Sequence, residues 1–338
     1  MEGIRRGDFY IVTHPPVREI VAERAAEIMA AFDPQAPRYP GDEAIDTRRH
    51  EAAAQVSGRT ILTMDPVIAR KLARTANPYP SVVFLAPEAA AAYAAAGLPP
   101  GRTGYFAGRA APMGAVTAEV VIATFYSFQP ELIRSCIPAA WSAASPEVIL
   151  RHRLTSVDAV LRRVLGDEVV AGPEMKEADR LARVAAEACQ PEGRALFAGH
   201  ASLPWPGESH LDLWHSLTLL REHRGDGHLI ALQVAGYSGC DAMVMTKAMG
   251  GVPAAFVATR AWSAEQWAES ADSLRSRGLI DGDGVATEAG RAHREAVERQ
   301  TDLLALAPLE TLGEDGCLRL RELIRPMSAA IAGDLFPR

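Results

Sequence analysis

The stretch SAEQWAESADSLRSRGLIDGDGVATEAGR, residues 263–291, decides how the last third of this 338-residue chain should fold. Ser263 can cap a helix N-terminus, and the acidic Glu265 in the first turn suits the positive end of the helix dipole. Gly278 is a typical residue at a helix C-terminus, and Asp281-Gly282-Asp283-Gly284 is a turn sequence. The order predicts a helix that ends at Gly278, a small β-wing, and a second helix.

The region around this stretch, residues 241–305, follows the order helix, helix, helix, turn, helix. This layout resembles the MarR-type regulators, in which a recognition helix runs into a wing and then into a long helix. Arg277-Gly278-Leu279 and Thr287-Glu288-Ala289-Gly290-Arg291 carry the resemblance. It implies a winged-helix domain whose helices over 287–305 and 315–332 form a homodimer.

The charge of the expected recognition helix argues against specific DNA binding. Lysines and arginines supply much of the affinity for DNA, because they displace counterions from the phosphates. Between residues 263 and 286, five carboxylates stand against two arginines, Arg275 and Arg277, and the wing has no basic residue. Trp267 lies mid-helix, where a base-reading side chain is expected. Specific DNA binding is therefore disfavoured.

The rest of the chain is predicted to be mainly α. Apolar residues make up 48% of the chain and recur at helical spacing between Pro and Gly residues. Helices are expected over 65–76, 87–96, 116–127, 130–142, 146–165, 174–189, 208–223 and 227–249. We predict three parts: an extension over 1–63, a multi-helical ligand or catalytic domain over 64–240, and the winged-helix domain over 241–338.

Composition also bears on the cellular setting. The N-terminus has no signal-peptide pattern, and no segment approaches the ~20 apolar residues of a membrane span. The net charge of −7 suits solubility more than nucleic-acid binding. The four cysteines lie far apart without metal-site spacing, which predicts buried free thiols. We expect a cytoplasmic protein without a membrane partner.

Residues 1–58 differ from the rest of the chain. Phe9-Tyr10-Ile11-Val12, Thr13-His14-Pro15-Pro16 and an expected amphipathic helix near 17–32 resemble the C-terminal tail of short-chain dehydrogenases. The glycine-rich cofactor turn and the Tyr-x-x-x-Lys pair of that family are missing from the sequence. Neither a nicotinamide cofactor nor dehydrogenase activity is therefore expected.

From Asp65 to about Ala332 the chain resembles a bacterial family of helix-turn-helix proteins. Three motifs carry this resemblance: GYFAGRAAP at 104–112, ATFY at 123–126 and LREHRGDGH at 220–228. The family implies a fold but brings no known reaction with it.

The last of these motifs belongs to the segment with the most chemical character. Five of the nine histidines lie between residues 200 and 228. Histidine changes charge near neutral pH, and neighbouring carboxylates and arginines can tune or orient it. The predicted catalytic residues are His215, Glu222, His223, Asp226 and His228. The predicted substrate contacts in this segment are Trp214 and Arg224.

Helix geometry argues against a metal in this cluster. His215 and Glu222 are about 10.5 Å apart along a helix axis, too far to share one ion. A metal would need Glu222 with Asp226 or His228 and further ligands from elsewhere. No metal ligand is therefore predicted.

Two glycines break the expected helix in the same motif. Gly225 and Gly227 weaken helix continuity and permit close approach of the backbone, which predicts a charged bend over 221–228. The bend is either a functional site or a buried network of arginine and carboxylate side chains.

A second candidate site is the segment Gly104–Gly114, which is predicted to be a loop. Tyr105 and Arg109 could clasp a carboxylate or an aromatic ligand, because a guanidinium can bind a carboxylate through two hydrogen bonds. The glycine spacing does not fit a phosphate-binding motif. Tyr105 and Arg109 are predicted to contact substrate; the alternative is a loop packed between helices.

Three functions are compatible with these observations. The leading one is a small-molecule-handling protein, an acid/base enzyme that uses the cluster at 210–228 for an unidentified reaction. Arg109 would line the same site, where histidine would exchange protons and arginine would hold an anionic or carbonyl group. The second is a ligand-responsive winged-helix transcription factor in which the same pocket binds an effector. The third is a non-catalytic accessory protein that covers a dehydrogenase partner through residues 1–58. The first two require a small-molecule ligand, and the sequence names no cofactor.

Overall fold

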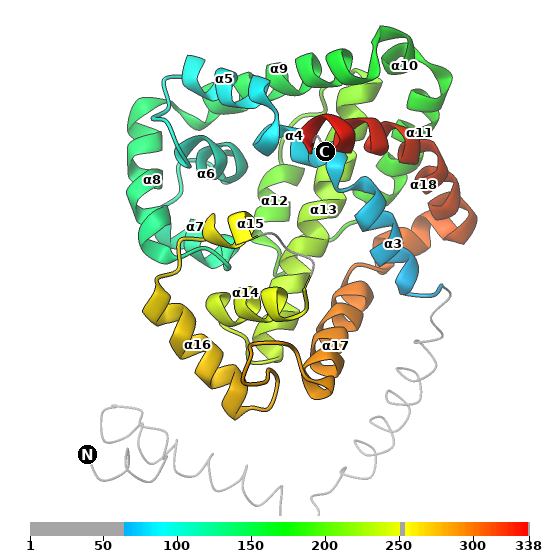
Figure 1. The fold of residues 1–338 in the computed structure, drawn as a ribbon. Coiled ribbons are helices and arrows are strands. Elements are labelled where there is room, and N and C mark those ends of the chain that lie inside the picture. The colour runs from blue at the N-terminus through cyan, green and yellow to red at the C-terminus, as the bar shows by residue number, and fades with distance from the viewer. Residues whose placement is uncertain (1–63, 251–253, 337–338) are drawn as a thin grey trace, which may run out of the picture. The chain divides into compact units, whose positions relative to one another are not determined.

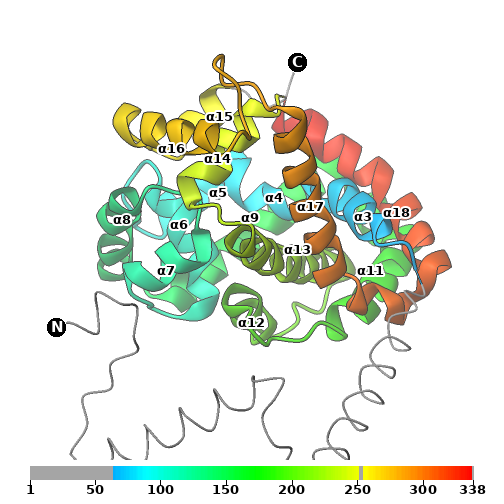
Figure 2. The ribbon, with the colours of Figure 1, turned by 90° about the horizontal axis from the view of Figure 1, so that it is seen from below.

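The computed structural model describes residues 64–250 and 254–336. The chain divides into two units, Met1–Ile61 and Leu62–Arg338. In the described part of the second unit, helices surround the long α13 (Ser209–Val234), as Figures 1 and 2 show. The prediction of a mainly α protein is confirmed. The stretch that resembles a dehydrogenase tail, residues 1–58, lies outside the described residues.

The largest hydrophobic core lies between six helices. They are α3 (Val67–Ala76), α4 (Pro78–Leu85), α9 (Pro146–Leu165), α11 (Pro173–Glu187), α13 and α18 (Ala307–Leu335). Leu213 and Leu217 of α13 and Ile324 and Ile331 of α18 are buried in this core. Each such side chain contributes about 1.5–3 kcal/mol when it is fully buried. This burial fixes α18 against helices from the first half of the chain.

Smaller helices cover a second side of α9. They are α5 (Pro87–Ala95), α6 (Thr103–Ala110), α7 (Ala118–Phe125) and α8 (Pro130–Ala143), with the 3₁₀ turn η2 (Ala111–Met113) after α6. Phe106 of α6 and Ile133 and Ile137 of α8 are fully buried between them. Two short helices, α10 (Asp167–Ala171) and α12 (Ala195–Ala201), lie on either side of α11 in the chain.

The C-terminal third has its own core. Its helices are α14 (Gly239–Ala248), α15 (Ala254–Ala258), α16 (Ala264–Ser276) and α17 (Glu288–Leu304). The side chain of Ser263 accepts a hydrogen bond from the backbone N–H of Gln266, and Gly278 has a φ of +71°. The start and end predicted for α16 from its N-cap and its terminal glycine are confirmed.

The predicted β-wing is wrong for the described residues, which contain only one antiparallel bridge here, Ile280 to Ala286. The carboxylate of Asp281 accepts hydrogen bonds from the N–H groups of Asp283 and Val285 and closes a short turn. The N–H of Ala286 then donates to the carbonyl of Ala248 at 3.0 Å. The returning chain is therefore bonded to the end of α14 and does not extend a strand pair.

The helix α13 joins the two cores. Leu213 and Leu217 lie in the large core, and Ala231 and Leu232 of the same helix lie in the C-terminal core. A domain boundary near residue 240 stays a prediction. So does the use of 287–305 and 315–332 in a homodimer, although both ranges are helical, within α17 and α18.

Two further sequence expectations concern side-chain chemistry and membranes. All four cysteines are buried and free, as predicted. Among the described residues no single helix is long and apolar enough to cross a bilayer. Taken together, α13 and α14 meet that criterion by length and composition, but they are bent by 94°.

Candidate functional site

The predicted bend over 221–228 is wrong, because α13 runs without a break from Ser209 to Val234. The close approach of a neighbouring helix explains the glycine at 227. A Cβ atom there would lie 2.7 Å from Nη1 of Arg194 and 3.2 Å from Cβ of Leu304. Leu304, at the end of α17, and Arg194 can pack this closely against α13 only because residue 227 has no side chain. The helix nevertheless continues through this glycine.

Glu222 lies in a buried ion cluster. Its side chain is 1% exposed, and its two oxygens accept hydrogen bonds from Arg109, from Nη2 at 2.7 Å and from Nε at 3.3 Å. Arg221 donates to the same carboxylate. Burial opposes the charged form of Glu222, but the two guanidiniums outweigh it and hold the pKa well below its usual range. Glu222 is therefore a poor proton acceptor.

Arg109 belongs to a helix, and the predicted loop over 104–114 is wrong. Most of the segment forms α6 and η2. Gly104 and Gly108 allow α6 to touch Tyr93, since a Cβ on Gly108 would lie 2.1 Å from the Tyr93 hydroxyl oxygen. The guanidinium of Arg109 lies 4.5 Å from the centre of the Phe125 ring. Arg109 reaches a carboxylate, as its chemistry allows, but the carboxylate belongs to Glu222.

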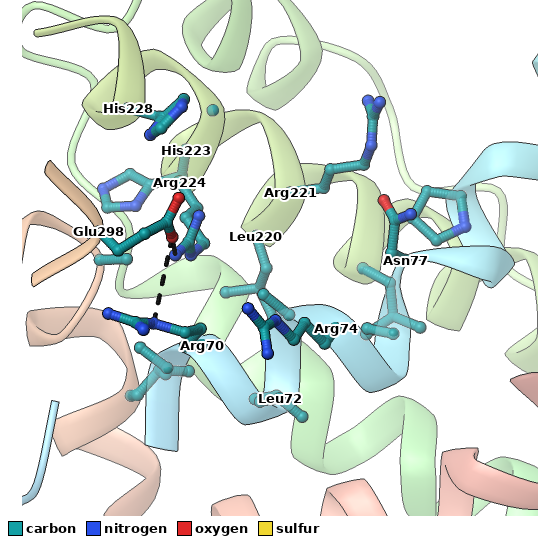
Figure 3. Close-up of a pocket in the computed structure, with 18 residues that line it drawn as sticks. Arg70, Leu72, Arg74, Asn77, Leu220, Arg221, His223, Arg224, His228 and Glu298 are labelled. Carbon is teal, nitrogen blue, oxygen red and sulfur yellow. Dashed lines mark hydrogen bonds and ion pairs between the residues drawn. The ribbon is translucent and has the colours of Figure 1, made fainter. Parts of the chain in front are cut away.

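A cavity of about 430 Å³ lies between α3, α4, α13, α17 and the start of α18. Figure 3 shows Arg70 and Arg74 of α3 on one side of it and Leu220 and Arg224 of α13 on the other. Two of the predicted catalytic residues, His223 and His228, also line the cavity, as does Glu298 of α17. Apolar side chains complete the wall: Leu72, Pro80, Leu217 and Leu309. The cavity has the size and mixed lining of a small-molecule site.

The two cavity histidines are held in their neutral form. Burial, with a smaller contribution from the nearby Arg194, lowers the pKa of His223 to about 4. Burial likewise lowers the pKa of His228 to about 4, with Arg294 adding to the effect. The ring of His223 packs edge-on against Phe197, and Nδ1 of His228 lies 2.9 Å from the hydroxyl of Thr301. Both rings therefore offer hydrogen bonds without charge near neutral pH.

Two arginines that line the cavity, Arg70 and Arg224, belong to an ion network with α17 that the sequence did not predict. The buried carboxylate of Asp302 accepts from Nη2 of Arg224 at 2.7 Å and from Nε of Arg70 at 2.8 Å. Glu298 also accepts from Arg224, at 3.3 Å. These partners lie more than 70 positions from Arg224 in the chain, so no local spacing indicated the pairing.

Some donors at the cavity remain without a partner. Among the described residues Arg74 has no ion pair, and Nε of Arg224 is buried with no hydrogen-bond partner. A buried donor that is left unbonded costs about 1–3 kcal/mol, and this applies to Nε of Arg224. Arg74 is exposed and lines the cavity with its charge unpaired, so both groups could bind an anion there.

His215 and Trp214 lie away from the cavity. The ring of His215 packs edge-on against Trp205 at 4.9 Å between centroids. Burial lowers the pKa of His215 to about 4, and Arg153 and Arg183 contribute. Trp214 is buried in the large core, with the guanidinium of Arg153 5.2 Å from its ring.

Arg153 and His200 form a polar pair that was not predicted. Nη1 of Arg153 donates to the carbonyl of Gly108 at 2.8 Å and lies 3.3 Å from Nε2 of His200. Burial and the Arg153 charge lower the pKa of His200 to about 3. The pair joins α9 to α6 and α12 and is closed off from solvent.

Asp226 caps the start of α12. Its carboxylate accepts a hydrogen bond from the backbone N–H of Phe197 at 3.0 Å. Burial raises the pKa of Asp226 to about 6, although that hydrogen bond opposes the shift. Among the nine predicted site residues, only His223, Arg224 and His228 line the cavity; the others lie in the ion cluster, the cores, α6 and this cap.

One group of described side chains could hold a metal ion by distance. The ligand atoms of Asp158, Glu208 and His210 lie within 4.8 Å of one another. Arg162 donates to Asp158 at 2.8 Å and to Glu208 at 2.9 Å. A guanidinium thus already neutralises both carboxylates, which leaves the group poorly suited to a cation.

The exposed face of α16 is acidic. Glu265, Glu269 and Asp272 are exposed. Both arginines of the helix are bound within the molecule: Arg275 to Asp272 and to a backbone carbonyl, and Arg277 to two carbonyls after α13. Trp267 is partly buried against the C-terminal core, so it does not stand out as a base-reading side chain.

Comparison with known proteins places this fold in a family. Neither the curated proteins nor the solved structures contain a significant match to the chain. The sequence model of a helix-turn-helix family matches residues 69–337, which is most of the chain. The protein belongs to this helix-turn-helix family.

Proposed function

We propose that this protein is a ligand-binding helix-turn-helix protein. Its cavity between α3 and α13 would bind a small organic anion, such as a carboxylate that carries a hydrocarbon group. The observation that carries the proposal is the donor set of the cavity. Nε of Arg224 is buried without a partner, and the exposed Arg74 has no ion pair among the described residues; both line the cavity beside an apolar wall. A carboxylate would bind the guanidiniums while its hydrocarbon part covers Leu220 and Leu309.

The same geometry gives less support to the acid/base enzyme predicted from the sequence. Glu222 is bound by two arginines, and the cavity histidines are neutral and have low pKa values. A general base works best when its pKa lies near the working pH. Asp226 approaches this range but caps α12 and does not line the cavity.

The family supports a regulatory role for the ligand. We propose that α14 to α17 follow a MarR-like order without a developed wing, and that the protein acts as a homodimer. The capped α16 and the single bridge after it support this reading. The ligand would then be an effector, as in the second function that the sequence suggested, but its target would not be a specific DNA site read by the acidic α16.

Calorimetry with benzoate, phenylbutyrate and octanoate tests the cavity, with the matching alcohols as uncharged controls. Arg74→Gln should weaken carboxylate binding about tenfold, because one charge-assisted hydrogen bond is lost. Arg299→Gln, an exposed arginine outside the cavity, should leave the affinity unchanged. The proposal fails if no carboxylate binds, or if the alcohols bind as well as the acids.

A further inference from the structure

A group of arginines and aromatic rings lies outside the cavity. We call Arg102, Arg260, Tyr105 and Phe128 the arginine–aromatic cluster. The guanidinium of Arg102 lies 4.7 Å from the centre of the Tyr105 ring, and that of Arg260 lies 4.1 Å from the centre of the Phe128 ring. Such stacking attracts a cation to the face of the ring, but it supplies no negative charge.

The positive charge of this cluster is not balanced. Arg109, next to it, already takes the carboxylate of Glu222. Neither Arg102 nor Arg260 has a carboxylate partner among residues 64–250 and 254–336, and Nε of each is buried without a hydrogen bond. Burial lowers the pKa of Arg260 to about 10, and the charges of Arg102 and Arg109 add to this. The guanidiniums of Arg102 and Arg260 lie 5.5 Å and 4.1 Å from the centre of the same Phe128 ring, and two unpaired positive charges around one ring indicate a place for an anion.

The cluster joins two regions of the fold. Arg102 directly precedes α6, and Arg260 lies in the turn between α15 and α16. That turn is bonded to the segment after α7: the N–H of Gln129 donates to the carbonyl of Arg260, and Nε1 of Trp262 donates to the carbonyl of Ser127. An anion between the two arginines would add a charged contact to these hydrogen bonds.

Backbone strain marks the same junction. Ala261 has a φ of +60° and Tyr126 a φ of +43°, in the left-handed region that non-glycine residues rarely adopt. Conformations of this kind are energetically unfavourable and concentrate at ligand clamps and switch regions. The surrounding hydrogen bonds hold the turn in a conformation that it would not take by itself.

We propose that Arg102 and Arg260 bind a phosphate group, either free phosphate or the phosphate of a small ester, and that this anion ties the turn between α15 and α16 to α6. Two guanidiniums without carboxylates match a doubly charged anion better than a singly charged one. The hydroxyl of Tyr105 has no partner among the described residues and can donate a third hydrogen bond. This site is distinct from the cavity and uses different arginines.

Calorimetry at constant ionic strength tests the site with inorganic phosphate and with phenyl phosphate. Arg102→Gln and Arg260→Gln should each weaken binding at least about tenfold. Arg151→Gln, an exposed arginine outside the cluster, should bind as the wild type does. Arg260→Gln removes a partly buried guanidinium that has no carboxylate partner but stacks on Phe128, so its melting temperature should change only slightly and its circular dichroism should match that of the wild type; lost binding then cannot be assigned to unfolding.

The two probes identify the source of the phosphate. Tighter binding of phenyl phosphate supports an ester, and equal binding supports the free anion. The proposal is overturned if neither compound binds at millimolar concentration, if binding survives both substitutions, or if only duplex DNA binds. Failure of the cavity would leave these results unchanged, because the carboxylate test depends on Arg74 and not on Arg102 or Arg260.

Discussion

Glu222 shows how one buried residue can be mistaken for a catalytic one. Its position among histidines on α13 suggested proton transfer, and its surroundings show an ion cluster. The sequence could indicate that Glu222 is important, because arginines lie next to it in the chain. The sequence placed Arg109 in the same predicted site as a substrate contact, but it could not indicate that Arg109, more than a hundred positions away, binds Glu222 itself.

The substitution Glu222→Gln should lower the free energy of unfolding by about 3–5 kcal/mol, since it leaves Arg109 and Arg221 without a counter-charge in a buried place. Urea denaturation at pH 7 measures this loss. Glu295→Gln is the matched control, because Glu295 also pairs with an arginine, Arg70, but is 51% exposed. Its loss should stay at about 0–1 kcal/mol. Equal losses in the two variants would contradict the role of Glu222 as a buried partner.

Among the helices, local signals predicted ends better than they predicted continuity. Ser263 and Gly278 fixed the limits of α16, because a cap depends on residues next to one another in the chain. Gly225 and Gly227 suggested a break in α13, but the helix continues through both. Helix packing outweighs the weak intrinsic preference of glycine, and packing depends on residues that are distant in sequence.

The two glycines of α13 give a matched pair for testing this account. Gly225→Ala should raise the free energy of unfolding by up to about 1 kcal/mol, because alanine favours helix and the new Cβ meets only Glu222 Oε2 at 3.7 Å. Gly227→Ala should lower it by about 1–3 kcal/mol, because the new Cβ would press on Arg194 and Leu304.

Thermal and urea denaturation of both variants measure the difference. Arg194 is held by the carbonyls of His223 and Leu304 and cannot move freely away from Gly227. If Gly227→Ala were as stable as Gly225→Ala, the close approach of α17 to α13 would not be what selects glycine at position 227.

The whole molecule carries a net charge of −7, and the region from α14 to α17 does not reverse that sign locally. The exposed side chains of α16 are mainly acidic, and its arginines are engaged within the protein. The sequence predicted this from a count of charges, and the structure adds that the two positive side chains are not free. A polyanion approaching α16 would meet repulsion first.

Duplex DNA should therefore bind only in the non-specific range, with a dissociation constant of about 10⁻⁴–10⁻⁶ M at physiological salt, and the affinity should fall steeply as salt rises. Fluorescence anisotropy with mixed-sequence duplexes measures both.

Replacing Glu265, Glu269 and Asp272 together by lysine should tighten binding and steepen its salt dependence, because three phosphates can then be neutralised. The same triple change to glutamine separates lost repulsion from gained attraction. A nanomolar site selected from genomic fragments by the wild-type protein would show that another surface, and not α16, reads DNA.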